Sequence, residues 1–213
     1  MRGKWAAGIP PRNFTWVIQD QLAMSERPGG FAPHHRRVRR QEEIIWLRVQ
    51  GFTRIVSMLP SPHNLQAYEK GEIASAHFPV PSSGDARDAL SELFSQLDDW
   101  LANREKVLVH QEELGDGVVG AVAGFLLWSG RLPAGPQTIA VVERLSSRQL
   151  GPMGRELVSQ AAEIARIRRG TQGPPGSRGA LGAHGALGAH GSRGALGAHG
   201  AKGPLGTSSG VGS

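Results

Sequence analysis

The residues that could do chemistry gather in one short segment, 110–117, which reads His-Gln-Glu-Glu-Leu-Gly-Asp-Gly. The apolar run 107–109 before it is typical of a buried strand, and the apolar run from 118 onward is typical of a buried helix. A loop between a strand and the start of a helix turns several backbone N–H groups toward one spot, which suits it to bind a phosphate group. We therefore interpret 110–117 as a candidate anion-binding or catalytic loop.

This segment resembles the HCxxGxxR(S/T) signature of the cysteine-dependent protein tyrosine and dual-specificity phosphatases. His110 matches the His of the signature. The resemblance places the family's nucleophilic Cys on Gln111, its phosphate-binding Arg on Gly117 and its middle Gly on Leu114. The Ser/Thr position falls on Val118. The layout of the loop is present, but its reactive side chains are replaced.

The resemblance extends beyond the loop. The strings at 13–25 and 42–59 are similar to the opening strand pair of the small atypical dual-specificity phosphatases and to the helix and strand that follow it. The string 77–82 matches the strand that runs into their general-acid loop, and Ser82 stands on the usual Asp. The matching strings occur in the family's order across residues 13–169, so the resemblance implies a phosphatase-like domain over that range.

The chemistry of that family needs a thiolate nucleophile, a guanidinium that binds two phosphoryl oxygens, and a carboxylic acid that protonates the leaving group. The chain has no Cys, and neither Gly117 nor Ser82 can supply the other two groups. Asp85 is a nearby carboxylate but has no nucleophile to assist. We predict a catalytically inactive pseudophosphatase, not an enzyme, that acts as a binding or scaffold module. The alternative is an enzyme on the same fold that uses carboxylate- or metal-dependent chemistry at the His110–Asp116 loop.

Three acidic residues, Glu112, Glu113 and Asp116, lie within this loop. Each like-charge contact with a phosphate would cost on the order of 4 kcal/mol at about 4 Å and an effective dielectric of about 20. We therefore expect the loop to reject phosphate. The same acids with His110 could instead be metal ligands, and Glu112 or Glu113 could be a nucleophile. We favour neither, and predict no metal and no cofactor.

Apolar periodicity along the domain predicts alternating strands and helices. The clearest helix is 85–103, where Leu90, Leu93 and Leu97 recur at helical spacing. Ser61 is expected to cap a short helix that has Pro62 in its first turn. Helices are predicted near 38–50, 62–70, 85–103, 117–129, 134–146 and 152–168, and strands near 13–18, 21–25, 53–59, 75–80 and 106–110. Strands separated by helices predict an α/β fold with a mostly parallel central sheet flanked by helices on both faces.

The last part of the chain is a low-complexity tail. From Gly170 to Gly206, thirteen Gly residues stand at every third position, which is the rule of the collagen triple helix. Only three of the other positions hold proline, namely Pro174, Pro175 and Pro204, so we favour a disordered tail over a trimerising stalk. We divide the chain into an N-terminal extension 1–12, the phosphatase-like domain 13–169, the Gly-X-Y tail 170–208 and terminal residues 209–213.

The charge of the chain is modest. The formal net charge is +6, but the tail holds three of the 24 basic residues and none of the 18 acidic ones, which leaves +3 for the rest. The run His34–Arg40 could bind an acidic partner, phosphoinositide or RNA; we favour a solvated loop that leads into a helix, and disfavour nucleic acid because no aromatic residues interleave the basic ones. No segment has the character of a signal peptide or membrane span. We expect a cytoplasmic protein with an unidentified protein partner.

Overall fold

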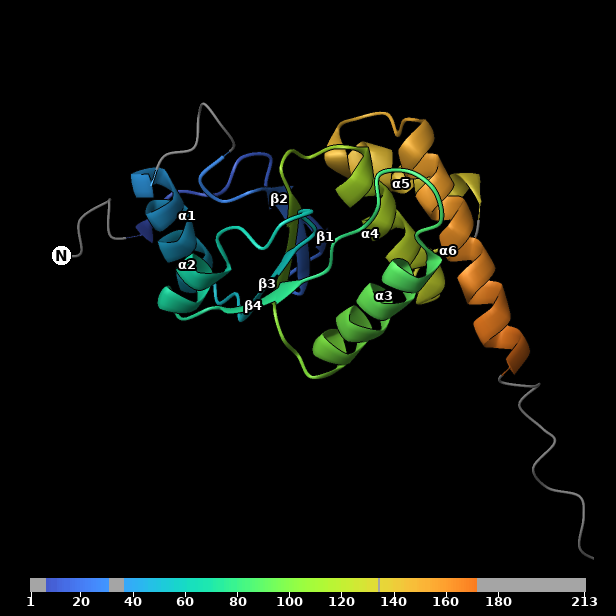
Figure 1. Ribbon diagram of the computed structural model, residues 1–213, viewed down its shortest axis with the longest axis horizontal. Helices are drawn as coiled ribbons and strands as arrows, with labels where there is room; N and C mark the ends of the chain where they lie inside the picture. The colour runs from blue at the N-terminus through green and yellow to red at the C-terminus, as the bar shows by residue number, and fades with distance from the viewer. Residues whose placement is uncertain (1–6, 31–36, 134, 172–213) are drawn as a thin grey trace, which may run out of the picture. The chain divides into compact units, whose positions relative to one another are not determined.

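The computed structural model describes residues 7–30, 37–133 and 135–171, and these are built around one five-stranded sheet (Figure 1). The strands lie in the order β1-β2-β5-β3-β4. Only the pair of β1 and β2 is antiparallel, and the other three pairs are parallel. The bounds are Thr15–Ile18 for β1, Leu22–Glu26 for β2, Arg54–Ser57 for β3, Ala74–His77 for β4 and Val107–Gln111 for β5. The predicted α/β fold with a mostly parallel central sheet is confirmed.

Helices cover both faces of this sheet (Figure 1). Helices α1 (Arg37–Val49) and α2 (Leu65–Lys70) lie on one face, whereas α3 (Arg87–Ala102), α4 (Asp116–Trp128), α5 (Pro136–Ser146) and α6 (Pro152–Thr171) lie on the other. Because side chains alternate along a strand, each central strand contributes to two apolar layers. Leu108 of β5 packs in the layer under α1 and α2, and its neighbours Val107 and Val109 pack in the larger layer under α3 and α4.

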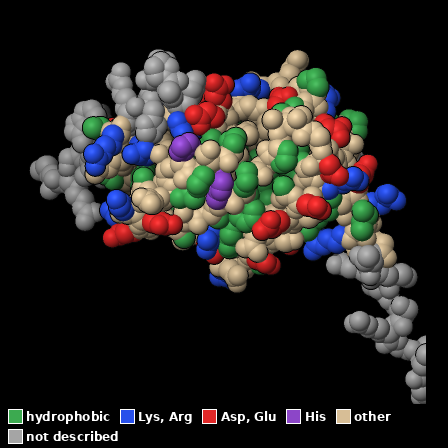
Figure 2. Space-filling view, in the orientation of Figure 1, with side chains coloured by type: hydrophobic (Ala, Val, Ile, Leu, Met, Phe, Trp, Pro, Cys, Tyr) green, Lys and Arg blue, Asp and Glu red, His purple; other side chains and the backbone are tan. Residues whose placement is uncertain are grey.

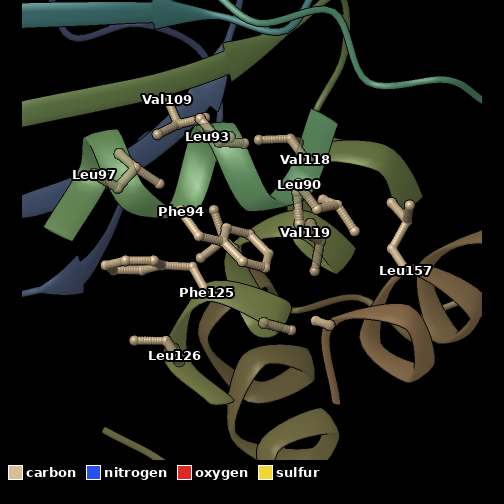
Figure 3. Close-up of a cluster of buried hydrophobic side chains, with 14 of the residues drawn as sticks. Leu90, Leu93, Phe94, Leu97, Val109, Val118, Val119, Phe125, Leu126 and Leu157 are labelled. Carbon is tan, nitrogen blue, oxygen red and sulfur yellow. The ribbon is translucent and has the colours of Figure 1, made fainter. Parts of the chain in front are cut away.

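The larger layer explains why α4 is apolar on every side. Leu90, Leu93 and Phe94 of α3 point toward Val118 and Phe125 of α4, with β5 and α6 closing the cluster (Figure 3). Twelve of the thirteen residues of α4 are buried, so no polar stripe is needed. The helix is thereby held firmly at the end that carries the loop.

Helix α6 approaches α4 closely because two glycines face each other. A Cβ added to Gly120 would lie 2.7 Å from the Cα of Gly154, a separation that packed atoms do not adopt. Small residues at both positions therefore let the two helix backbones meet.

The predicted element boundaries fall within three residues of those in the structure. The largest error at a helix start is α2, which begins at Leu65 and not at Pro62. The prediction that Ser61 caps this helix is wrong, because its carbonyl instead accepts the N–H of His63 at 2.8 Å in a tight turn. Asn64 then enters the helix with a φ of 68°, a left-handed conformation that Asn tolerates better than most residues.

The Gly-X-Y tail from residue 172 onward and the segment 31–36 lie outside the described residues, so the predictions made for them stand as predictions. Within the described ranges, no helix is both long and apolar enough to span a membrane.

Candidate functional site

The candidate loop lies at the carboxyl edge of the sheet, where β5 ends at Gln111 and α4 begins at Asp116. Strands β2 and β3 run parallel to β5 on either side of it, with Glu26 aligned to Gln111 and Ser57 aligned to His110. Segments that follow all three strands therefore meet at one edge, which is where open α/β sheets bind ligands. The predicted strand, loop and helix around 110–117 are present.

His110 lies beneath the loop and is completely buried. Its Nε2 atom and the hydroxyl of Tyr68 on α2 are 3.0 Å apart and share a hydrogen bond. Burial lowers the pKa of His110 to about 3, because a charged ring would lose its hydration there. The ring is therefore neutral at physiological pH, and it joins the loop to α2 and is not available as a general acid.

Gln111, at the position of the family's nucleophile, folds toward the first turn of α4. A Cβ added to Gly117 would lie 2.8 Å from Nε2 of Gln111 and closer still to its Oε1. The carboxamide therefore fills the space in front of Gly117, and any larger residue at 117 must displace it. These two replacements of the family's Cys and Arg are sterically coupled.

Glu112 is not directed at an anion site but is paired with a cation. Its carboxylate lies 3.0 Å from the guanidinium of Arg27, which is 10% exposed at the side chain. The Nε of Arg27 also donates to the carbonyl of Gly30 at 2.9 Å. Arg27 directly follows β2, so the parallel pairing of β2 with β5 brings it to the loop.

Asp116 is likewise engaged elsewhere. Its carboxylate accepts the N–H of Gly151 at 3.0 Å and the N–H of Gly154 at 3.4 Å, at the start of α6. A carboxylate at this place satisfies N–H groups that have no partner within the helix and complements the helix dipole. Of the three loop acids, only Glu113 is exposed. The repulsion that we expected from three acids is therefore largely offset by these partners.

Arg148, which sequence reasoning missed, also holds the loop. It precedes α6 and its guanidinium donates to the carbonyl of Leu114. The signature places a phosphate-binding Arg within the loop itself, at Gly117, but this cation comes from a segment 34 residues away from the carbonyl that it contacts. Nothing in the local sequence around Arg148 marks it as a loop contact.

The general-acid position offers no proton donor. Ser82 is exposed. Asp85 forms a side-chain pair with Arg87 at 2.6 Å, and the hydrogen bonds from Arg87 lower the pKa of Asp85 to about 2. This carboxylate is therefore ionised at neutral pH, and it cannot donate a proton to a leaving group.

The structure gives no support to a metal site at the loop. Among the described residues, no group of three or more His, Asp or Glu side chains is arranged to hold a metal ion. Glu112 and Asp116 are directed at Arg27 and at α6, and His110 is buried against Tyr68.

No protein-family model and no curated protein matches the sequence. Solved structures do match the fold. The kinase associated phosphatase KAP, with its catalytic-site cysteine replaced by serine, matches with a TM-score of 0.59 and 20% identity over 76% of this chain and 97% of its own. Tk-PTP in its active form matches with a TM-score of 0.56 and 17% identity over 71% of this chain and 97% of its own.

The catalytic core of the PP-IP phosphatase Siw14 from S. cerevisiae, in complex with citrate, matches with a TM-score of 0.55 and 15% identity. That match covers 79% of this chain and 98% of the Siw14 core. Because all these identities are low, the similarity shows the fold alone. The chain has the fold of protein tyrosine and dual-specificity phosphatases.

One prediction from the sequence is corrected by these matches. We predicted a protein that is not an enzyme, and this is wrong as a classification, because the chain shares its fold with phosphatases over nearly their full length. The missing side chains bear on one mechanism, the thiolate route, for which the chain has no Cys.

Proposed function

We propose that residues 13–169 work as a ligand-binding domain on the phosphatase fold, without cysteine-dependent phosphoryl transfer. The observation that carries the proposal is the pair Gln111 and Gly117, which stands where that mechanism needs a thiol and a guanidinium. A carboxamide is not a nucleophile toward phosphate esters at neutral pH, and Gly117 has no side chain with which to bind the transferred group. The chain contains no Cys at all, so no thiol from another position can act as the nucleophile.

The contacts of the loop support the proposal. The Gln111 carboxamide already occupies the space before the first turn of α4, so an oxyanion approaching the helix N-terminus would have to displace it. Displacing the carboxamide loses its contacts, and a phosphate bound by backbone N–H groups alone would have to compensate for that loss. We therefore keep the expectation of weak or absent phosphate binding, and assign it to Gln111 more than to the loop acids.

The test is hydrolysis of p-nitrophenyl phosphate by the full chain, with and without Mg²⁺ and Mn²⁺. We expect the metal-free rate to equal that of buffer, since the nucleophile, the phosphoryl clamp and the acid are all missing. Vanadate-sensitive turnover without metal would refute the proposal. Turnover that requires Mg²⁺ or Mn²⁺ would favour the alternative of carboxylate- or metal-dependent chemistry at the loop.

A second test asks whether the Gln111 side chain, and not the charge of the loop acids, limits anion binding at the loop. Tungstate binding is measured by calorimetry for the unmodified protein and for Gln111→Ala. We expect binding to appear or strengthen in the variant, because the shortened side chain opens the space before Gly117. Millimolar or tighter tungstate binding to the unmodified protein would contradict the expectation.

The Gly-X-Y tail would make the binding domain multivalent if it trimerised. We keep the proposal of a tail without a triple helix, because three Pro among 37 residues pre-order little of the chain. Sedimentation of the full chain as a monomer, with rapid tryptic cleavage after Arg178 and Arg193, is the expected result. A trimer whose tail resists trypsin would show the opposite. A cytoplasmic location likewise stays a prediction.

A further inference from the structure

A groove of about 750 Å³ runs between α1 and α2, on the face of the sheet opposite to α3 and α4. We call it the basic groove. Its cationic side chains are Arg37, Arg40, Arg48 and Lys70, and His63 also lines it. In the space-filling view, Lys and Arg side chains lie over α1 and α2 (Figure 2). This volume is within the range of sites that hold ligands.

One stripe of α1 forms a wall of the basic groove. Arg37, Arg40, Ile44 and Arg48 recur three or four residues apart, so they share one helix face, and Ile45 lies beside them. Ile44 is 5% exposed and packs in the core under α1. The wall therefore presents the partly exposed Ile45 between two cationic ends.

Among the described residues that line the basic groove, there is no Asp or Glu. Arg40 donates to the amide oxygen of Asn64 at 2.6 Å, which holds the guanidinium at the wall of the groove. Arg48 pairs at 2.8 Å with Glu72, which is 76% exposed, so solvent screens this pair.

The chain itself cannot supply the missing negative charge from its undescribed segments. Residues 1–6, 31–36, 134 and 172–213 contain no Asp and no Glu, but do contain Arg and Lys. None of these segments carries an acidic side chain that could fill the groove, so we assign its acidic occupant to another molecule.

The length of the basic groove decides which kind of anion fits. Arg37 and Arg48 are eleven residues apart on one helix, which places their Cα atoms about 16 Å apart along its axis. A single phosphate cannot contact both ends. An extended peptide spans this distance with about five residues, at roughly 3.3 Å each, and its central side chains would lie on Ile45.

We propose that the basic groove binds an extended segment of a partner protein that carries acidic side chains at both ends of a short apolar centre. This goes beyond the proposed binding function, on which it rests, by naming the surface and the class of partner. Carboxylates meet the cationic ends, and the apolar centre covers Ile45.

The probe is a fluorescein-labelled peptide with two Glu five positions apart around a Leu/Ile centre, titrated with the full chain by fluorescence anisotropy. We compare Arg37→Glu/Lys70→Glu with Arg166→Glu/Arg169→Glu, which makes the same change of net charge on exposed residues of α6. The groove variant should weaken binding tenfold or more, because two attractions become repulsions. The α6 variant should change it less than twofold.

The groove variant is expected to fold, since Arg37 and Lys70 are both exposed and Glu at the start of α1 complements the helix dipole. Circular dichroism checks this, and if the variant is unfolded then Arg37→Gln/Lys70→Gln replaces it with the same expected direction. Binding should also weaken when the two Glu of the peptide are replaced by Gln.

Three results would overturn the groove proposal: equal weakening by the groove and α6 variants, equal binding of the Gln peptide, or no binding below about 1 mM. Equal competition by single-stranded RNA would show attraction to charge and not to peptide. A partner recovered by the full chain whose capture ignores the groove variant would refute the groove and leave the proposed binding function standing. Metal-free, vanadate-sensitive phosphatase activity would refute that function instead.

Discussion

Gln111 and Gly117 should behave as one coupled unit, which a double-mutant cycle can measure. In the structure, a Cβ at position 117 would lie 3.0 Å from the amide carbon of Gln111 and nearer to its amide heteroatoms. Gly117→Ala therefore forces the carboxamide out of its place. The same substitution after Gln111→Ala meets no such obstacle, because the carboxamide is gone.

The expected magnitudes follow from two opposing effects. Ala is favoured over Gly within a helix by roughly 0.5–1 kcal/mol, and the φ of Gly117 is not positive, so Ala can adopt its conformation. Overpacking costs about 1–3 kcal/mol, and a flexible side chain such as that of Gln111 keeps the cost near the lower end. Gly117→Ala alone should be neutral to destabilising by roughly 2 kcal/mol, and stabilising by roughly 0.5–1 kcal/mol in the Gln111→Ala background.

The assay is urea unfolding of the four proteins, with the free energy of unfolding obtained by linear extrapolation. The matched control is Gly115→Ala, since a Cβ at Gly115 would have no atom within 4 Å. Gly115→Ala should show no coupling to Gln111→Ala. A coupling between positions 111 and 117 below about 0.5 kcal/mol would mean that the carboxamide does not occupy this space, and the explanation of weak phosphate binding would fail with it.

Three further predictions test other contacts. Gly120→Ala should destabilise the protein by roughly 1–3 kcal/mol in urea unfolding, because its Cβ would collide with the backbone of Gly154. Stability should fall as pH drops from about 6.5 to about 3: the pKa of His110 is about 3 when folded and about 6.5 when unfolded, so in that window the unfolded chain binds the extra proton. Unfolding at pH 7 and pH 4 should differ less in His110→Asn, and an equal difference would contradict this assignment. Asp116→Ala should cost about 1–2 kcal/mol through the lost N–H partners of α6, whereas Glu113→Ala, on an exposed side chain, should be nearly neutral.

Local patterns in the sequence were sufficient to predict the elements and the position of the loop. The apolar run before His110 and the continuous apolar run after Gly117 require a buried strand and a buried helix, and the loop between them has few alternatives. Helix α3 was predicted closely because Leu90, Leu93 and Phe94 repeat at helical spacing and are all buried. These features depend on neighbours within one or two turns.

The directions of the loop side chains could not be predicted in the same way. Glu112 pairs with Arg27, and Asp116 accepts N–H groups from Gly151, which is 35 residues away. Such partners are fixed by strand order and helix packing, which the spacing of residues in the sequence does not contain. A prediction that β2 pairs with β5 would have placed Arg27 near the loop. No short-range signal marks the contact of Arg148 with Leu114.

The contacts of the loop also show which groups keep its shape. Arg148 holds the Leu114 carbonyl, α6 holds the Asp116 carboxylate, and Arg27 holds Glu112. All three partners come from outside the loop, and each contributes about 1 kcal/mol as a partly buried or charge-assisted contact. Gln111 belongs to none of these contacts, so shortening it should open the space before α4 while the loop keeps its shape. Access to the loop therefore depends on Gln111, whereas the shape of the loop depends on Arg27, Arg148 and α6.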